Sequence, residues 1–185
     1  MTPKETLRKK QRKVDHSENV EAIFLNLTSL IKWGSKPIIA GYWPIAGEID
    51  DRAFLEYCHN QGLQCGLPFI TDQASPLTFK AWQPSDVLEK AMYGIPAPAR
   101  EALDLVPNVL LIPLLAFDRA CYRLGRGGGF YDRTLAHLRE NHTVWAIGLA
   151  YDCQEIDHVK REAHDQQLDC IVTPSRVVYR YKHLC

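Results

Sequence analysis

Residues 117–132 read FDRACYRLGRGGGFYD, and this stretch decides the fold. Four of the five residues from 125 to 129 are glycine, with Arg126 among them. An apolar run at residues 109–117 leads into the stretch. At its other end, residues 129–139 have apolar side chains at the spacing of a helix. A buried strand, a glycine-rich loop and a helix in this order predict an α/β fold in which the loop and the helix N-terminus bind an anion.

The rest of the chain alternates predicted strands with predicted helices. A capping box at Thr2 begins one helix, and amphipathic or capping patterns predict others at residues 20–31, 50–61 and 129–139. Residues 101–105 are expected to form one helical turn. Apolar runs predict strands at residues 38–43, 64–70, 77–82, 109–114, 143–149, 170–173 and 177–181. We therefore predict an α/β fold: one domain over residues 1–185, with an open sheet, helices on both faces and a phosphate-binding loop between a strand and a helix.

Composition narrows the class of protein. The 185 residues are 46% apolar, which suits one sizeable core and is too much for a disordered chain. The 22 Lys and Arg residues balance 22 Asp and Glu, which argues against a surface built for nucleic acid or an anionic membrane. The longest apolar run is nine residues, whereas a membrane-spanning helix needs about twenty. With no apolar signal segment behind the polar first residues, we expect a soluble, cytoplasmic protein without a nucleic-acid or membrane partner.

The glycine-rich loop has the composition of an oxyanion site. Glycines let the backbone approach a ligand closely, and the following helix N-terminus adds partial positive charge. Arg123 and Arg126 add forked donors that suit phosphate or carboxylate oxygens. The loop is neither a Walker A motif nor a dinucleotide fingerprint at the usual spacing. Glycine content alone is equally compatible with a flexible helix entry, but the two arginines favour phosphate binding.

Two carboxylates are candidate ligands of Mg²⁺, which prefers oxygen ligands and shares its shell with phosphate. Asp132 lies one turn into the helix after the loop, and Asp169 precedes a predicted buried strand. Each also has a purely structural interpretation. Asp132 suits the first turn of a helix through the helix dipole, and Asp169 can be an ordinary residue at a strand edge.

Two further segments carry candidate ligand-binding residues. Lys4 and Arg8 share one face of the basic first helix, which can be a solvated surface, a nucleic-acid contact or a contact to phosphates held by the loop. Trp43 and Glu48 lie where a predicted strand passes through a Pro/Gly turn. Trp43 offers a flat apolar face to a ring, and Glu48 can accept from ring N–H groups or simply be solvated.

Together these motifs resemble the 5-formyltetrahydrofolate cyclo-ligase family, also called methenyltetrahydrofolate synthetases. The resemblance covers nearly the whole chain, and the RLGRGGGFYD segment at residues 123–132 is its most specific part. It also includes Lys4 with Arg8, residues 42–48, GLAYD at 148–152 and LDCIVTP at 168–174. Many family members have glycine where this chain has Cys121, a departure that concerns the turn before Arg123.

The resemblance implies an enzyme that converts 5-formyltetrahydrofolate and ATP into 5,10-methenyltetrahydrofolate, ADP and phosphate with Mg²⁺. It implies that Arg123 and Arg126 neutralise charge at the γ-phosphate, and that Asp132 and Asp169 ligate Mg²⁺. The implied ATP-binding residues are Lys4, Arg8, Arg123, Leu124, Gly125, Arg126, Gly127, Gly128, Gly129, Phe130 and Tyr131. The implied folate-binding residues are Trp43, Glu48, Arg126, Gly127, Gly128, Gly129 and Phe130.

Other functions also remain open from the sequence. The same fold could sequester a reduced folate or a nucleotide without turnover, and the basic first helix could bind nucleic acid, although overall neutrality disfavours the latter. The expected partners are small-molecule substrates, and the expected state is a monomer or weak dimer.

Overall fold

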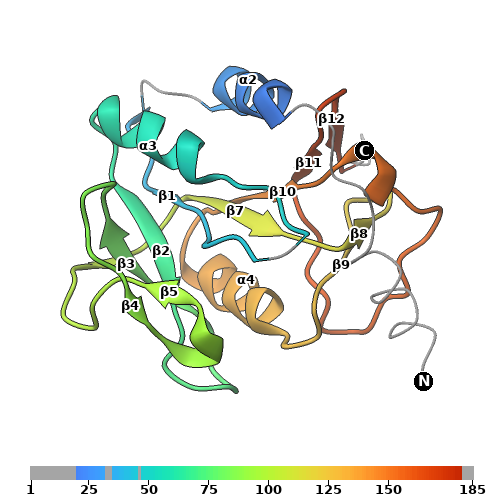
Figure 1. Ribbon diagram of the computed structural model, residues 1–185. Helices are drawn as coiled ribbons and strands as arrows, with labels where there is room; N and C mark the ends of the chain where they lie inside the picture. Colours follow the sequence, from blue (N-terminus) through green and yellow to red (C-terminus); the bar gives the residue numbers. More distant parts are fainter. Residues whose placement is uncertain (1–19, 32–34, 46, 181–185) are drawn as a thin grey trace.

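The computed structural model describes residues 20–31, 35–45 and 47–180 (Figure 1). The helix predicted from Thr2 lies outside these residues. The described α-helices are α2 (Val20–Leu30), α3 (Arg52–Asn60) and α4 (Phe130–Asn141), and the short 3₁₀ helices are η2 (Met92–Gly94) and η3 (Asp152–Gln154). These α-helices confirm the three amphipathic predictions within three residues at either end. Within the described residues, no helix is long and apolar enough to cross a membrane.

An eight-stranded sheet forms the centre of the molecule, in the order β12-β11-β10-β7-β1-β2-β3-β6. The five strands from β11 to β2 in this order run parallel, whereas β12, β3 and β6 pair antiparallel at the two edges. The strands are β1 (Ile39–Ala40), β2 (Cys65–Phe69), β3 (Thr78–Trp82), β6 (Asp104–Leu105), β7 (Val109–Pro113), β10 (Trp145–Leu149), β11 (Cys170–Val172) and β12 (Val177–Tyr179). The open α/β sheet predicted from the sequence is thus confirmed.

Helices cover both faces of this sheet because the central strands bury side chains on both sides (Figure 1). On β7, Leu111 packs into the cluster that includes Ile23 of α2 and Leu55 of α3. Its neighbours Leu110 and Ile112 pack on the opposite face with Leu135 of α4. The two-residue side-chain period of a strand therefore divides the apolar core into two layers.

The prediction of a helical turn at residues 101–105 was wrong, because none of these residues is helical. Asp104–Leu105 is the edge strand β6, which pairs with Phe79 and Lys80 of β3. Leu105 is buried, and the Asp104 carboxylate forms an ion pair with Lys80, whose Nζ lies 2.9 Å from Asp104 Oδ1. Pairing with the free edge of β3 provides hydrogen-bond partners for backbone groups that one helical turn would leave unpaired. The sequence around residues 104–105 contains no pattern that indicates this pairing.

Two small hairpins lie outside the main sheet, and the sequence did not indicate either. One pairs β4 (Glu89–Lys90) with β5 (Pro96–Ala97), and the other pairs β8 (Ala116–Phe117) with β9 (Arg123–Leu124). The second hairpin connects the end of β7 to the glycine-rich loop. It therefore fixes where this loop begins relative to the sheet.

Candidate active site

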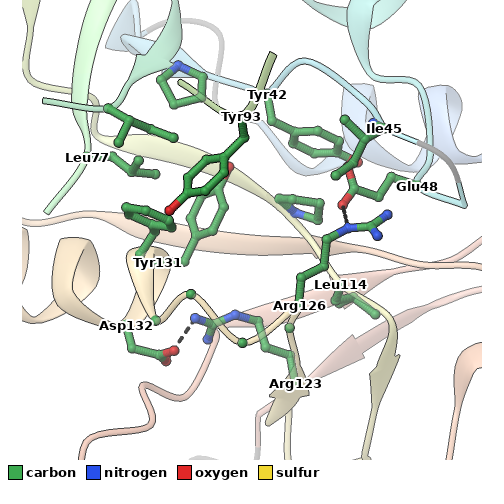
Figure 2. A pocket seen from close by; sticks show the side chains of 18 of the residues that line it. Tyr42, Ile45, Glu48, Leu77, Tyr93, Leu114, Arg123, Arg126, Tyr131 and Asp132 are labelled. Atoms are coloured by element: carbon green, nitrogen blue, oxygen red, sulfur yellow. Dashed lines mark hydrogen bonds and ion pairs between the residues drawn. The ribbon is translucent and has the colours of Figure 1, made fainter. Parts of the chain in front are cut away.

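A cavity of about 800 Å³ opens at the carboxyl ends of the parallel strands, where open α/β sheets commonly bind ligands (Figure 2). Pro113 and Leu114 at the end of β7 form part of its lining, and Pro68 and Ile70 line it from β2 and the residues after it. The loop after β1, the β4–β5 hairpin, the glycine-rich loop and a segment near residue 160 complete the wall. Segments far apart in the sequence therefore converge on one site.

Two glycines of the glycine-rich loop adopt backbone conformations that other residues disfavour. Gly127 and Gly129 have φ of 106° and 66°, in the left-handed region that side chains disfavour. Gly129 is the N-cap of α4 and has no side chain to cap it, so the first backbone N–H groups of this helix can donate to a ligand. The cavity is lined by every residue predicted here to bind ATP, from Arg123 to Tyr131. Loop and helix end are thus suited to an anion.

Arg126 and Glu48 join the glycine-rich loop to the loop after β1 (Figure 2). Arg126 Nε donates to Glu48 Oε1 at 2.8 Å, and the Ile45 amide donates to Glu48 Oε2 at 3.1 Å. The Glu48 side chain is only 6% exposed, which strengthens a charge-assisted hydrogen bond by excluding water. Arg126, predicted to bind both ATP and folate, is therefore in direct contact with Glu48, predicted to bind folate.

Arg123 holds Asp132 in a second ion pair at the same cavity (Figure 2). Its Nη2 donates to Asp132 Oδ1 at 2.8 Å, and its Nη1 donates to the Gln166 carbonyl at 2.8 Å. The Gln166 amide also donates to Asp132 Oδ1, at 2.9 Å. These two hydrogen bonds to Asp132 converge on Oδ1, and the Arg123 side chain, 5% exposed, acts as a fixed support for the carboxylate.

Asp169 is not brought to this site. Its Oδ2 accepts from Arg139 Nη2 at 3.1 Å and from the Ala146 amide at 2.9 Å, while its Oδ1 lies 3.2 Å from Arg180 Nη2. It does not line the cavity. Both oxygens are engaged in tying β10, α4 and the segment after β12 together, so the geometry does not support the Mg²⁺ role implied for Asp169.

Asp165 lines the cavity with Asp132, as do Glu48 and Glu162. It directly precedes Gln166, whose amide bonds Asp132. The sequence analysis missed Asp165 because it lies in a polar stretch with several other acidic residues and belongs to no regular element. Only the fold shows that this part of the polar stretch reaches the cavity.

Aromatic side chains form the other end of the cavity. Trp43 lines it as predicted, with the Arg52 guanidinium 4.8 Å from its ring centre. Phe130 meets Tyr93 of the β4–β5 hairpin edge to face, with ring centres 6.2 Å apart. Sequence reasoning missed Tyr93, whose φ of 60° is unusual for an aromatic residue and cannot be seen in the sequence. Flat apolar rings of this kind suit a planar ligand.

Tyr42 and Tyr131 also line the cavity, and both stay neutral over a wide pH range. Burial raises the pKa of each phenol well above 10, and the nearby Glu48 carboxylate raises it further. Tyr42 donates its hydroxyl to the Ile49 carbonyl at 2.8 Å, which braces the loop that carries Glu48. Lys4 and Arg8, also predicted to bind ATP, lie outside the described residues.

Comparisons with known proteins point to one family. The model of the 5-formyltetrahydrofolate cyclo-ligase family matches residues 3–174. The 5-formyltetrahydrofolate cyclo-ligase of Escherichia coli K12 is 34% identical over 144 residues, which cover 75% of this chain and 79% of that protein. The Haemophilus influenzae enzyme of the same name is 31% identical over 80% of this chain and 81% of its own length.

A solved structure shares the whole fold. The NMR structure of Aquifex aeolicus 5,10-methenyltetrahydrofolate synthetase superposes with a TM-score of 0.82 at 26% identity, covering 100% of this chain and 96% of that one. A family match over most of the chain, curated relatives above 30% identity and this structural likeness all agree. The chain belongs to the 5-formyltetrahydrofolate cyclo-ligase family.

Proposed function

We propose that this protein catalyses the ATP-dependent cyclisation of 5-formyltetrahydrofolate to 5,10-methenyltetrahydrofolate, with release of ADP and phosphate. The observation that carries the proposal is the contact between Arg126 and Glu48, since it joins the glycine-rich loop, which is suited to phosphate, to the loop after β1, which carries Trp43. Family membership supplies the reaction, and the cavity supplies groups suited to both substrates.

The chemistry requires two substitutions in sequence. First, the formyl oxygen attacks the γ-phosphorus of ATP; an O–P bond forms, the bond to the β-phosphate oxygen breaks, and ADP leaves. Then N10 of the folate attacks the formyl carbon, the carbon–oxygen bond breaks, and phosphate leaves as N10 loses its proton. No side-chain nucleophile is needed, so the work of the protein is to position the reactants and stabilise charge.

Arg126 and the amides of Gly127, Gly128 and Gly129 are suited to the charge that develops on the transferred phosphoryl group. Arg126 is 27% exposed at the cavity and close enough to Glu48 to exchange one oxyanion partner for another. Glu48 would then accept from the N–H groups of the folate ring, beside Trp43. Phe130 would cover the reacting groups from the α4 side.

Asp132 and Asp165 are the residues we propose for Mg²⁺, in place of the pair Asp132 and Asp169. Both line the cavity beside the glycine-rich loop, and Asp132 accepts the hydrogen bonds from Arg123 and the Gln166 amide through Oδ1. Two carboxylates that leave room for phosphate oxygens fit the usual ligand set of Mg²⁺. When bound, the ion would act as a Lewis acid on the phosphates.

The remaining expectations stay proposals. We propose one catalytic domain over residues 1–185, acting in the cytoplasm as a monomer or weak dimer on reduced folate and ATP. The ATP-binding role of Lys4 and Arg8 belongs to the same proposal. Nucleic acid is not expected as a partner, because the charge of the chain is balanced.

The decisive experiment follows formation of the methenyl product through its near-ultraviolet absorbance. Purified protein with ATP, Mg²⁺ and 5-formyltetrahydrofolate is expected to produce this absorbance, and omission of ATP should abolish it. Arg126→Ala should lower kcat/KM by at least about a hundredfold, because the negative charge on the transferred phosphoryl group loses a hydrogen-bond donor in the transition state. The far-ultraviolet circular dichroism should be unchanged. Tight binding of both substrates without product would instead identify a sequestering protein.

A further inference from the structure

Among the described residues, four cationic or potentially cationic side chains line the cavity, and three of them have acidic neighbours. Arg123 pairs with Asp132 and Arg126 pairs with Glu48. His164 lies 3.7 Å from Glu162 and 3.9 Å from Asp165. The fourth is Lys160: in the part of the chain that the structure describes, no carboxylate lies within 4 Å of its ammonium group.

The backbone on both sides of Lys160 is anchored. Val159 is buried, and its amide donates to Asp118 Oδ2 at 3.1 Å. The Arg161 guanidinium lies 4.0 Å from the centre of the Tyr122 ring and 3.4 Å from the same Asp118 oxygen. Lys160 is therefore held between two fixed neighbours, although its own side chain stays exposed at the cavity.

The anchor is itself part of the hairpin that leads into the glycine-rich loop. Asp118 is 2% exposed, and its Oδ1 accepts from the amides of Ala120 and Tyr122 in the β8–β9 turn. The Ile156 amide donates to the Phe117 carbonyl of β8 at 2.8 Å, which fixes the same segment a second time. Asp118 thus ties the Lys160 segment to the element that carries Arg123.

We infer that Lys160 binds an oxyanion of a bound substrate, an assignment that rests on the proposed function. A phosphate oxygen of the nucleotide is the first source, because Lys160 shares a segment with Asp165 and an anchor with the hairpin before the glycine-rich loop. A glutamate carboxylate of the folate offers the same chemistry. Unlike Arg123 and Arg126, Lys160 does not have to exchange a protein carboxylate before it meets the substrate.

The test compares Lys160→Gln and Lys160→Arg with the wild-type chain by calorimetry. The control is Lys90→Gln, which removes an exposed lysine of β4 that does not line the cavity. The probes are a non-hydrolysable ATP analogue with Mg²⁺, and 5-formyltetrahydrofolate carrying one or three glutamates. Loss of one charge-assisted hydrogen bond corresponds to a rise in the dissociation constant of about tenfold.

A rise for the ATP analogue in Lys160→Gln, largely restored in Lys160→Arg, supports the inference with phosphate as the source. A rise confined to the triglutamate folate supports it with a carboxylate as the source. Unchanged constants for all three probes overturn it, and so does an equal rise in Lys90→Gln. Turnover of the wild-type chain is measured separately by absorbance, so failure of the proposed reaction and failure of the Lys160 contact give different results.

Discussion

Arg126 and Glu48 are 78 residues apart in the sequence, yet they form one ion pair within the cavity. Arg123 and Asp132 form another, nine residues apart. In each pair, a carboxylate holds the guanidinium at a defined place. At this scale the site is a set of oxyanion partners in which substrate oxygens can replace protein oxygens with little change in local charge.

The two carboxylates near the C-terminal half of the chain are expected to behave differently when neutralised. Asp165→Asn should raise the Mg²⁺ concentration for half-maximal rate by about tenfold or more, because a cavity carboxylate is lost. Asp169→Asn should leave this concentration unchanged and lower the free energy of unfolding by about 1–3 kcal/mol, because Arg139 and Arg180 lose their charged partner.

Magnesium titrations of the initial rate and urea unfolding of both variants separate these effects. If Asp169→Asn were the variant that weakened the response to Mg²⁺, the assignment of Asp165 would be wrong.

At the scale of elements, the entry to α4 depends on the left-handed conformation of Gly129. Its φ is 66°, and a Cβ there would lie 2.7 Å from Arg133 Nη1. That guanidinium is itself held, since its Nη2 donates to the Gln73 carbonyl at 2.9 Å and the group lies over the Phe130 ring. Arg133 therefore connects the start of α4 with the segment before β3 and with the Phe130 ring at the cavity.

Gly129→Ala is expected to lower the free energy of unfolding by about 1–2 kcal/mol, because alanine is strained in the left-handed region. Gly125→Ala is the matched control in the same loop, since a Cβ there meets nothing within 4 Å and its φ is outside that region. Urea unfolding of both variants gives the comparison. Equal effects of the two substitutions would contradict the role assigned to the Gly129 backbone.

At the scale of the whole molecule, stability depends on a buried carboxyl behind the site. Asp51 is 2% exposed; its Oδ2 accepts from the Tyr42 amide at 3.1 Å, and its Oδ1 has no hydrogen-bond partner among the described residues. Burial raises the pKa of Asp51 well above 3.8, and the charges of Asp50 and Glu48 add to the rise. Gly41 leaves the space for this side chain, since a Cβ there would lie 2.3 Å from Asp51 Oδ2.

The sign of the resulting pH dependence follows from linkage. Above pH 3.8 the unfolded chain loses the Asp51 proton while the folded chain keeps it, so this group lowers stability as pH rises toward its folded pKa. Asp51→Asn cannot ionise and can still accept the Tyr42 amide. Its stability relative to the wild-type chain should therefore increase from pH 4 upward, as measured by urea unfolding at several pH values. A difference that stays constant with pH would show that Asp51 is ionised in the folded protein.

The elements that could be predicted are those whose signal is local. The helices α2, α3 and α4 follow from apolar spacing, and the buried strands β7 and β10 follow from continuous apolar runs. Short strands such as β6 carry no such signal, because two residues become a strand only where another strand offers a free edge. Tyr93 could not be predicted for the same reason, because it lies at the cavity only through the β4–β5 hairpin, whose strands are also two residues long.

The sequence by itself determined the strand, the glycine-rich loop and the helix after it, and with them the family resemblance. Side-chain periodicity, glycine conformation and the start of a helix each depend on a few neighbouring residues, so they can be recognised in a short stretch of sequence. Only the tertiary structure decided which carboxylate each arginine meets. Asp169 joins Arg139 and Arg180 while Asp165 reaches the cavity, because Coulomb attraction depends on distance in space, which the fold of the whole chain sets.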